Sequence, residues 1–284
     1  MNAAPLLEIE GLVVRYRTGR RTPPVVACDG VDLSIDAGEI AGLVGESGSG
    51  KSTVAAAVLG LAPVAAGTIR FRGEDITHVS GARRRALAQH VQVVFQDPFG
   101  SLSPRRTVGQ TLSEPLEVHR RLGRAERAAR ASAMLERVGL SATAVDRRPA
   151  ELSGGQRQRV AIARALILEP ELIVCDEALS ALDLSVQAQV LNLLQELQRD
   201  LGVSYLFIAH DMAVVRHLAR RVTVMRRGVV VERGDAQQLW DAPQHPYTRA
   251  LLAAIPDPDP AAQRRRRQAR EPGTTDDLPR AQAR

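Results

Sequence analysis

The sequence holds very few lysines, aromatic residues and cysteines. Of its 38 basic residues only Lys51 is a lysine, and aromatic residues make up 3% of the 284. The core is therefore expected to rest on Val, Leu, Ile and Ala. Two cysteines, Cys28 and Cys175, are too few for a disulfide-stabilised small domain. Because Cys175 lies within an apolar run, it is expected to be a small core residue.

Long apolar runs and strong charge are also missing. The longest mostly apolar uncharged run, residues 54–66, contains Gly60 and Pro63 and is shorter than the roughly 18 residues of a membrane span. The first residues lack a basic region and reach an acid at Glu8, which is not typical of a signal peptide. The net charge is +6, and half of it comes from residues 259–284, so the rest of the chain is only mildly basic. We expect a soluble, cytoplasmic protein that is able to dock on a membrane protein.

Apolar strands and helices alternate along the chain, and this pattern predicts an α/β fold with a mostly parallel sheet. Unbroken apolar runs such as 40–44 are typical of parallel strands buried on both faces. The predicted strands cover 6–16 (as an edge strand), 31–35, 40–44, 68–72, 91–95, 172–175, 205–209, 222–225 and 229–232. The predicted helices cover 52–60, 124–138 and 185–201, the last ending at Gly202.

The composition changes twice along the chain. From about residue 97 it becomes rich in Pro and Arg with helical stretches, so residues 97–157 are predicted to be a helical subdomain inserted into the sheet core. In the helix over 124–138, Ala128, Leu135 and Val138 share one predicted face. Residues 261–284 are basic and show no periodicity, which predicts a disordered tail.

A glycine-rich loop lies between an apolar strand and a helix. Residues 45–52 fit the phosphate-loop pattern G-x-x-x-x-G-K-S. Glycines let successive backbone N–H groups curl around a phosphate, and the following helix start attracts negative charge. Lys51 is expected to contact the β- and γ-phosphates, and Ser52 to bind Mg²⁺. The predicted nucleotide-binding residues of this loop are Gly45, Glu46, Ser47, Gly48, Ser49, Gly50, Lys51, Ser52 and Thr53.

Two acids follow the apolar strand at 172–175. Asp176 stands at the strand end, where a carboxylate can hold Mg²⁺ opposite Ser52. Glu177 comes next, and a carboxylate beside the metal can activate an attacking water molecule. The acids and the loop together predict hydrolysis of a nucleotide.

A second anion-binding segment reads L-S-G-G-Q over residues 152–156. Ser153 has the character of a helix N-cap, and Gly154 and Gly155 leave bare N–H groups at the helix start. Gln156 completes the motif. Because the Lys51 loop already holds the phosphates of one nucleotide, this second clamp indicates that another chain's nucleotide binds here.

These motifs resemble the nucleotide-binding subunits of ABC transporters over roughly residues 6–255. The resemblance implies a RecA-like P-loop NTPase core, an N-terminal antiparallel β subdomain and the inserted helical subdomain. It also implies that ATP and Mg²⁺ are bound. Residue 178 departs from the family pattern, because alanine stands where proline is usual after the acidic pair.

The resemblance assigns roles to four further residues. Tyr16 matches the aromatic residue that stacks on adenine, and Asp183 belongs to a loop that crosses the dimer interface. Gln96 matches the glutamine that contacts Mg²⁺ and water and relays to the membrane partner, and His210 matches the switch histidine near the γ-phosphate. The catalytic group is thus Glu177, His210 and Gln96, and the metal group is Ser52, Gln96 and Asp176.

Two stretches, 96–109 and 245–260, resemble the ATPases of bacterial dipeptide and oligopeptide importers, and more closely their F-type chain. Residues 1–240 would form the nucleotide-binding domain and 241–260 the C-terminal element of that branch. Its opening, His245–Tyr247, is interpreted as a buried aromatic turn that marks lineage and has no ligand role. In many relatives a cysteine-bearing tail holds an iron–sulfur cluster, and none is expected here because no cysteine follows Cys175.

The implied function is to supply ATP energy to an importer of dipeptides or oligopeptides, with nickel-chelate, glutathione or opine importers as alternatives. The implied partners are a second ABC ATPase subunit (a homologous D-type chain or a second copy), two membrane permease subunits and, indirectly, an extracytoplasmic solute-binding protein. The implied location is peripheral, on the cytoplasmic face of the inner membrane. The run Arg264–Arg267 is interpreted as a solvated tail, with contact to anionic lipid as the alternative.

Two other classes compete with this hypothesis. A soluble ABC ATPase acting on nucleic acid or ribosomes usually carries two cassettes, whereas one is visible here, so no nucleic-acid partner is expected. A regulatory domain without turnover would not need the intact Glu177 and His210.

Overall fold

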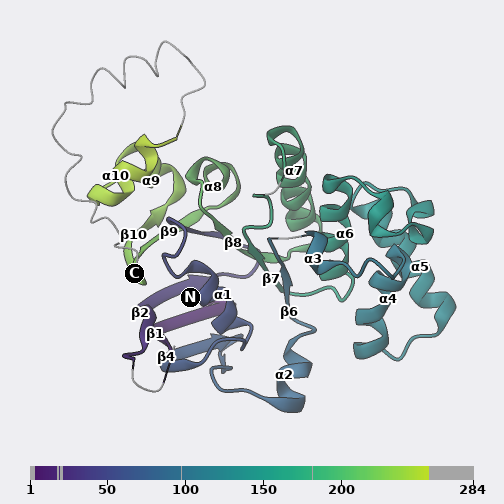
Figure 1. The fold of residues 1–284 in the computed structure, drawn as a ribbon, viewed down its shortest axis with the longest axis horizontal. Helices are drawn as coiled ribbons and strands as arrows, with labels where there is room; N and C mark the ends of the chain where they lie inside the picture. The colour runs from purple at the N-terminus through teal and green to yellow at the C-terminus, as the bar shows by residue number, and fades with distance from the viewer. Residues whose placement is uncertain (1–3, 18, 20–21, 97, 181, 256–284) are drawn as a thin grey trace, which may run out of the picture.

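The computed structural model describes residues 4–17, 19, 22–96, 98–180 and 182–255, and two β-sheets form its frame (Figure 1). The larger sheet has the order β10-β9-β3-β8-β7-β6, and all its neighbours are parallel except β10 and β9. Its strands are β3 (Ile40–Val44), β6 (Val91–Val94), β7 (Leu172–Asp176), β8 (Ser204–Ala209), β9 (Arg221–Arg226) and β10 (Val229–Asp235). The smaller, antiparallel sheet has the order β2-β1-β4-β5, with β1 (Leu7–Tyr16), β2 (Val25–Ile35), β4 (Val64–Phe71) and β5 (Glu74–Asp75). The predicted α/β fold is confirmed.

One strand prediction is wrong in its placement. β1 was expected at an edge, but it lies between β2 and β4 and pairs with both. Its side chains Leu7, Ile9, Leu12 and Val14 are buried. The hairpin between β9 and β10 is confirmed. Arg227 and Gly228 have φ of 51° and 85°, and a type I′ hairpin turn requires a positive φ at both of its central residues.

The helices are α1 (Lys51–Val58), α2 (Gly81–Leu87), α3 (Pro98–Ser101), α4 (Val108–His119), α5 (Arg124–Arg137), α6 (Gly154–Leu166), α7 (Leu184–Leu201), α8 (Met212–Leu218), α9 (Ala236–Asp241) and α10 (Pro246–Ala253). Two 3-10 turns, Ala142–Asp146 and Pro149–Glu151, precede α6. Figure 1 shows α3 to α6 gathered at one end of the molecule, away from the antiparallel sheet. The boundaries 97–157, 1–240, 241–260 and 261–284 stay predictions. Among the described residues, no helix is both long enough and apolar enough to cross a membrane.

The helix faces follow the predicted period with one exception. In α5 the buried residues are Ala131, Met134 and Leu135, followed by Val138, while Ala128 is exposed. The face that packs therefore begins one turn later than predicted. α7 ends at Gly202, whose φ of 65° is the left-handed conformation expected of a glycine that caps the C-terminal end of a helix.

Successive side chains of the parallel strands enter two different cores. Val44 and Cys175 belong to the core that holds α6 and α7, whereas their neighbours Leu43 and Val174 belong to the core that holds α1 and the antiparallel sheet. This is the alternation expected of strands buried on both faces. It places α1 and α6 on opposite faces of the larger sheet.

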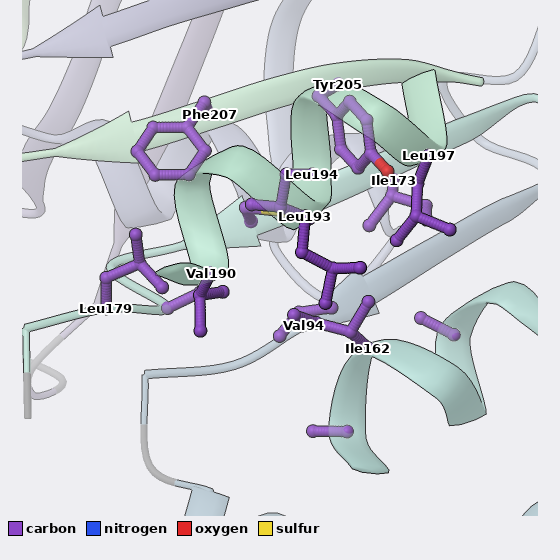
Figure 2. Packing of buried hydrophobic residues seen from close by; sticks show 14 of the residues in the cluster. Val94, Ile162, Ile173, Leu179, Val190, Leu193, Leu194, Leu197, Tyr205 and Phe207 are labelled. Carbon is purple, nitrogen blue, oxygen red and sulfur yellow. The ribbon is translucent and has the colours of Figure 1, made fainter. Parts of the chain in front are cut away.

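The core on the α7 side is continuous from α6 to β8 (Figure 2). Leu193 of α7 reaches toward Ile162 of α6 and Val94 of β6. Leu197, one turn further along α7, lies beside Tyr205 of β8. Because α6 and α7 share this packing, the helix that begins with the L-S-G-G-Q segment is fixed to this face of the parallel sheet.

Candidate functional site

The predicted site residues converge because parallel strands end together. The register pairs Val44 of β3 with Ala209 of β8, and Asp176 of β7 with Ile208 of β8. The segments that begin at Gly45, Glu177 and His210 therefore leave the sheet at one edge. The carboxyl edge of a parallel sheet is where α/β folds bind ligands.

The phosphate loop has a backbone that requires glycine at its two ends. Gly45 has φ of 152° and Gly50 has φ of 105°. A Cβ atom on Gly45 would lie 2.2 Å from the Met225 carbonyl oxygen, and one on Gly50 would lie 2.5 Å from that of Ala27. The loop is therefore enclosed by β9 on one side and β2 on the other.

Lys51 begins helix α1 and is almost completely enclosed. Its side chain is 3% exposed, and Nζ donates to the carbonyl oxygens of Gly45 at 2.8 Å and Glu46 at 2.9 Å. Nζ also lies 3.9 Å from Glu177 Oε1. Burial lowers the pKa of Lys51, although the carboxylates of Glu177 and Asp176 act to raise it. A compact cation thus lies where phosphates are expected.

Ser52 and Asp176 bring two hard oxygen ligands together. The Ser52 hydroxyl donates to Asp176 Oδ1 at 2.9 Å. Burial raises the pKa of Asp176, while the Ser52 hydrogen bond and the Lys51 charge act to lower it. A hydroxyl and a carboxylate beside a phosphate loop are the ligand types that Mg²⁺ prefers. The residues present therefore fit that ion.

Glu177 is held in an unusual conformation. Its φ of 47° is left-handed for a residue with a side chain, which costs about 1 to 3 kcal/mol. Its N–H donates to the Ile208 oxygen at 3.0 Å, and the Ser180 hydroxyl donates back to the Glu177 oxygen at 3.0 Å. Glu177 and His210 line the same hollow. Strained residues that surrounding contacts hold in place are typical of functional sites.

The L-S-G-G-Q segment forms the predicted helix start. Ser153 is the N-cap of α6: its Oγ accepts from the Gln156 N–H at 3.3 Å, and Gln156 Oε1 accepts from the Ser153 N–H at 3.0 Å. This reciprocal pair is a capping box. Asp183 is the N-cap of α7: its Oδ1 accepts from the Val186 N–H at 2.9 Å. This hydrogen bond is the main cause that lowers the pKa of Asp183.

The two glycines of this segment should respond differently to alanine. A Cβ on Gly155 would lie 2.6 Å from Val186 Cγ1, whereas one on Gly154 would lie 3.7 Å from Leu182 Cδ2, an ordinary contact. We expect Gly155→Ala to lower the free energy of unfolding by roughly 1 to 3 kcal/mol because α7 must shift. Gly154→Ala, the matched control, should change it by less than about 1 kcal/mol. Urea denaturation measures both, and equal values would contradict this packing.

Gln96 and Tyr16 lie at the margins of the site. Gln96 follows β6, whose Val94 pairs with Cys175, so it leaves the sheet at the same edge as Asp176. Tyr16 ends β1 opposite Val25 and is 37% exposed, as a stacking surface would be. Among the described residues, no hydrogen bond joins Gln96 or Tyr16 to the phosphate loop.

One residue of the site was missed from the sequence. The Tyr247 hydroxyl accepts a hydrogen bond of 2.9 Å from the Glu46 N–H, within the phosphate loop. The interpretation of His245–Tyr247 as a buried aromatic turn is right for the burial of Tyr247, which is 5% exposed, but the segment is the start of helix α10 rather than a turn. The contact spans 201 residues, and no local pattern in the sequence could have indicated it.

A parallel sheet with a phosphate loop, a strand-end acid pair and an L-S-G-G-Q helix on the other face defines the ATP-binding cassette class of ATPases. The model of the ABC transporter family matches residues 28–180, and the chain belongs to this family. A second model, the oligopeptide/dipeptide transporter C-terminal region, matches residues 231–280. The predicted resemblance to peptide-importer ATPases is thereby confirmed. ATP-binding proteins of this family bind ATP and are ATPases.

The names of curated relatives describe them as import ATP-binding proteins. The glutathione import ATP-binding protein GsiA of Escherichia coli K12 is 48% identical over 284 residues, which are 98% of this chain and 45% of GsiA. A Brucella ovis protein named, provisionally, as a peptide import ATP-binding protein is 49% identical over 266 residues, covering 94% of this chain and 83% of that one. The chain thus spans about half the length of GsiA but most of the Brucella protein.

Solved structures share the fold. The cbiO1 protein of Clostridium perfringens, described as part of an ABC transporter complex, matches with a TM-score of 0.75 and 29% identity, covering 84% of this chain and 92% of that one. The ATP-binding cassette MJ0796, solved as a dimer bound to ADP and Pi, matches with a TM-score of 0.73 and 28% identity, covering 81% and 98%.

Proposed function

We infer that this chain binds and hydrolyses Mg²⁺-ATP as the energy-supplying subunit of an importer, and that the imported substrates are peptides. The cluster of Lys51, Ser52, Asp176 and Glu177 at one sheet edge carries the inference. The import names of the relatives and the match to the peptide-transporter C-terminal region support the transport class.

Each residue has a distinct task in this proposal. N–H groups of the loop that follow Glu46 bind the phosphates, Lys51 offsets their charge, and Tyr16 supports the adenine. Ser52, Asp176 and Gln96 would hold Mg²⁺, which neutralises phosphate charge when bound. Glu177 accepts the proton of the attacking water, and His210 orients the reacting phosphate.

The site is proposed to be completed by another subunit. Because α1 and α6 lie on opposite faces of the parallel sheet, one chain's Lys51 loop and its own Ser153–Gln156 segment cannot enclose the same phosphates. A second copy of this chain, or a homologous D-type chain, would supply the other segment, with Asp183 at the contact between the two. The solved cassette MJ0796 is a dimer bound to ADP and Pi, which supports this arrangement.

Coupling to transport is proposed to run through the helices beyond Gln96. The predicted helical subdomain, 97–157, would contact two permease subunits at the cytoplasmic face of the inner membrane. An extracytoplasmic solute-binding protein would deliver the substrate. Glutathione, a small peptide, is a second candidate substrate because GsiA is named for its import.

The test uses the complex purified with its permease and binding protein, reconstituted in lipid vesicles. We expect ATP-dependent uptake of labelled peptides, with glutathione as a parallel arm. No ATP-dependent uptake in either arm would contradict the peptide-importer proposal. Binding to DNA or RNA that survives about 0.2 M salt would favour a nucleic-acid ATPase instead.

A further inference from the structure

Helix α10, the last helix of the described residues, contacts the phosphate loop through a tyrosine hydroxyl. α10 starts at Pro246, and the next residue, Tyr247, is buried with its Oη 2.9 Å from the Glu46 backbone nitrogen. Glu46 is the second residue of the loop. The loop thus receives a contact from a segment that lies outside the matched cassette region, 28–180.

Several groups hold Tyr247 in place. Its own N–H donates to His245 Nδ1 at 3.1 Å, and the His245 N–H donates to Glu232 Oε2 at 3.0 Å. The Arg226 guanidinium lies over the Tyr247 ring, 4.9 Å from its centre. Arg226 follows Met225, whose carbonyl closes on Gly45. The ring is therefore anchored to β9 and β10, which form a wall of the same loop.

The bond to Tyr247 differs from the two bonds that Lys51 makes to the loop. Lys51 Nζ donates to the carbonyl oxygens of Gly45 and Glu46. Because the same ammonium is proposed to contact the phosphates, its bonds to these carbonyls compete with ATP. The Tyr247 hydroxyl accepts from the Glu46 N–H instead, so it does not compete with a phosphate for the lysine.

We propose that Tyr247 is a positioning residue that fixes the Glu46 end of the phosphate loop and so raises the affinity for ATP. The proposal rests on the proposed ATP site and goes beyond it, since it gives the C-terminal element a part in nucleotide binding. A loop held in its binding conformation loses less freedom when ATP binds. Tyr247 touches no reacting group, so the effect falls on binding rather than on turnover.

The test is Tyr247→Phe in the full chain. Phenylalanine keeps the buried ring under Arg226 and removes the hydroxyl, and with it the acceptor of the Glu46 N–H. We expect the Kd and KM for ATP to rise about 3- to 10-fold, the worth of one neutral hydrogen bond, with kcat within about twofold of wild type. Isothermal titration and steady-state hydrolysis measure these values.

Tyr205→Phe is the matched control. Tyr205 is fully buried in β8, beside Leu197 (Figure 2), and its hydroxyl has no hydrogen-bond partner within the described part of the chain. Its loss should leave Kd, KM and kcat unchanged. The control shows what removing a buried tyrosine hydroxyl does away from the loop.

The outcomes separate this inference from the proposed function. If Tyr247→Phe binds ATP like wild type, or if its melting temperature and kcat fall while KM stays unchanged, the positioning role is wrong. In both cases the wild-type chain would still hydrolyse ATP and the proposed function would stand. If the wild-type chain binds no ATP, both the positioning role of Tyr247 and the proposed function are wrong.

Discussion

Lys51→Arg should give a folded chain that hydrolyses ATP about 10²- to 10³-fold more slowly, the usual cost of removing one donor to developing charge. The substitution keeps the positive charge, so it tests the effect of side-chain shape alone. The Lys51 side chain is 3% exposed, and its ammonium donates hydrogen bonds to two neighbouring carbonyl oxygens of the loop, those of Gly45 and Glu46. A planar guanidinium is wider and presents a rigid fork of donors. It cannot occupy this space without opening the loop.

The same substitution should cost little stability. Lysine and arginine have similar helix propensities, and residue 51 is the first of α1. Steady-state hydrolysis and a thermal melt followed by circular dichroism measure the two effects. The control is the reverse swap, Arg137→Lys, at an exposed position near the end of α5. Wild-type turnover in Lys51→Arg would mean that the one lysine among 37 arginines has no special role.

Glu177→Gln should bind ATP with near wild-type affinity and turn over about 10²- to 10⁴-fold more slowly, as expected on loss of a general base. Glutamine has the same shape and removes only the charge and the ability to accept a proton. The backbone bonds from Glu177 to Ile208 and Ser180 do not involve the changed atoms. The left-handed conformation at residue 177 is therefore expected to persist.

Single-turnover hydrolysis and nucleotide binding together measure this effect. Glu196→Gln, which removes an exposed acid from α7, is the matched control and should match wild type. Unchanged turnover in Glu177→Gln would remove Glu177 from the role of base. A parallel loss of ATP binding would instead indicate that the carboxylate is needed to hold Lys51, 3.9 Å away.

The parts of the site that the sequence predicted are those whose physics is local. The phosphate loop, the Asp176 strand end and the Ser153 cap each depend on residues within one strand–turn–helix unit. The meeting of the phosphate loop and Asp176 also followed from the sequence, because parallel strands end at one edge. The roles of Tyr16, Gln96, Asp183 and His210 came from the resemblance alone and stay predictions.

The features that the sequence did not predict depend on distant contacts. The pattern of β1 shows one buried face but not that β2 and β4 pair with both its edges. Ala128 fits the helical period, yet α5 packs only from Ala131 onward. The bond between Tyr247 and Glu46 joins segments 201 residues apart, and only the folded chain shows that they meet.

The central claim is that ATP binds between the Lys51 loop of one subunit and the Ser153–Gln156 segment of another. Sedimentation velocity of Glu177→Gln with saturating Mg²⁺-ATP tests it most directly, with the chain alone and then mixed with any ATPase subunit that copurifies in the complex. We predict a particle with the mass of two ATPase chains in at least one mixture, and a single-chain mass once Ser153→Arg is added. A single-chain mass in every mixture, with ATP bound, would contradict the account.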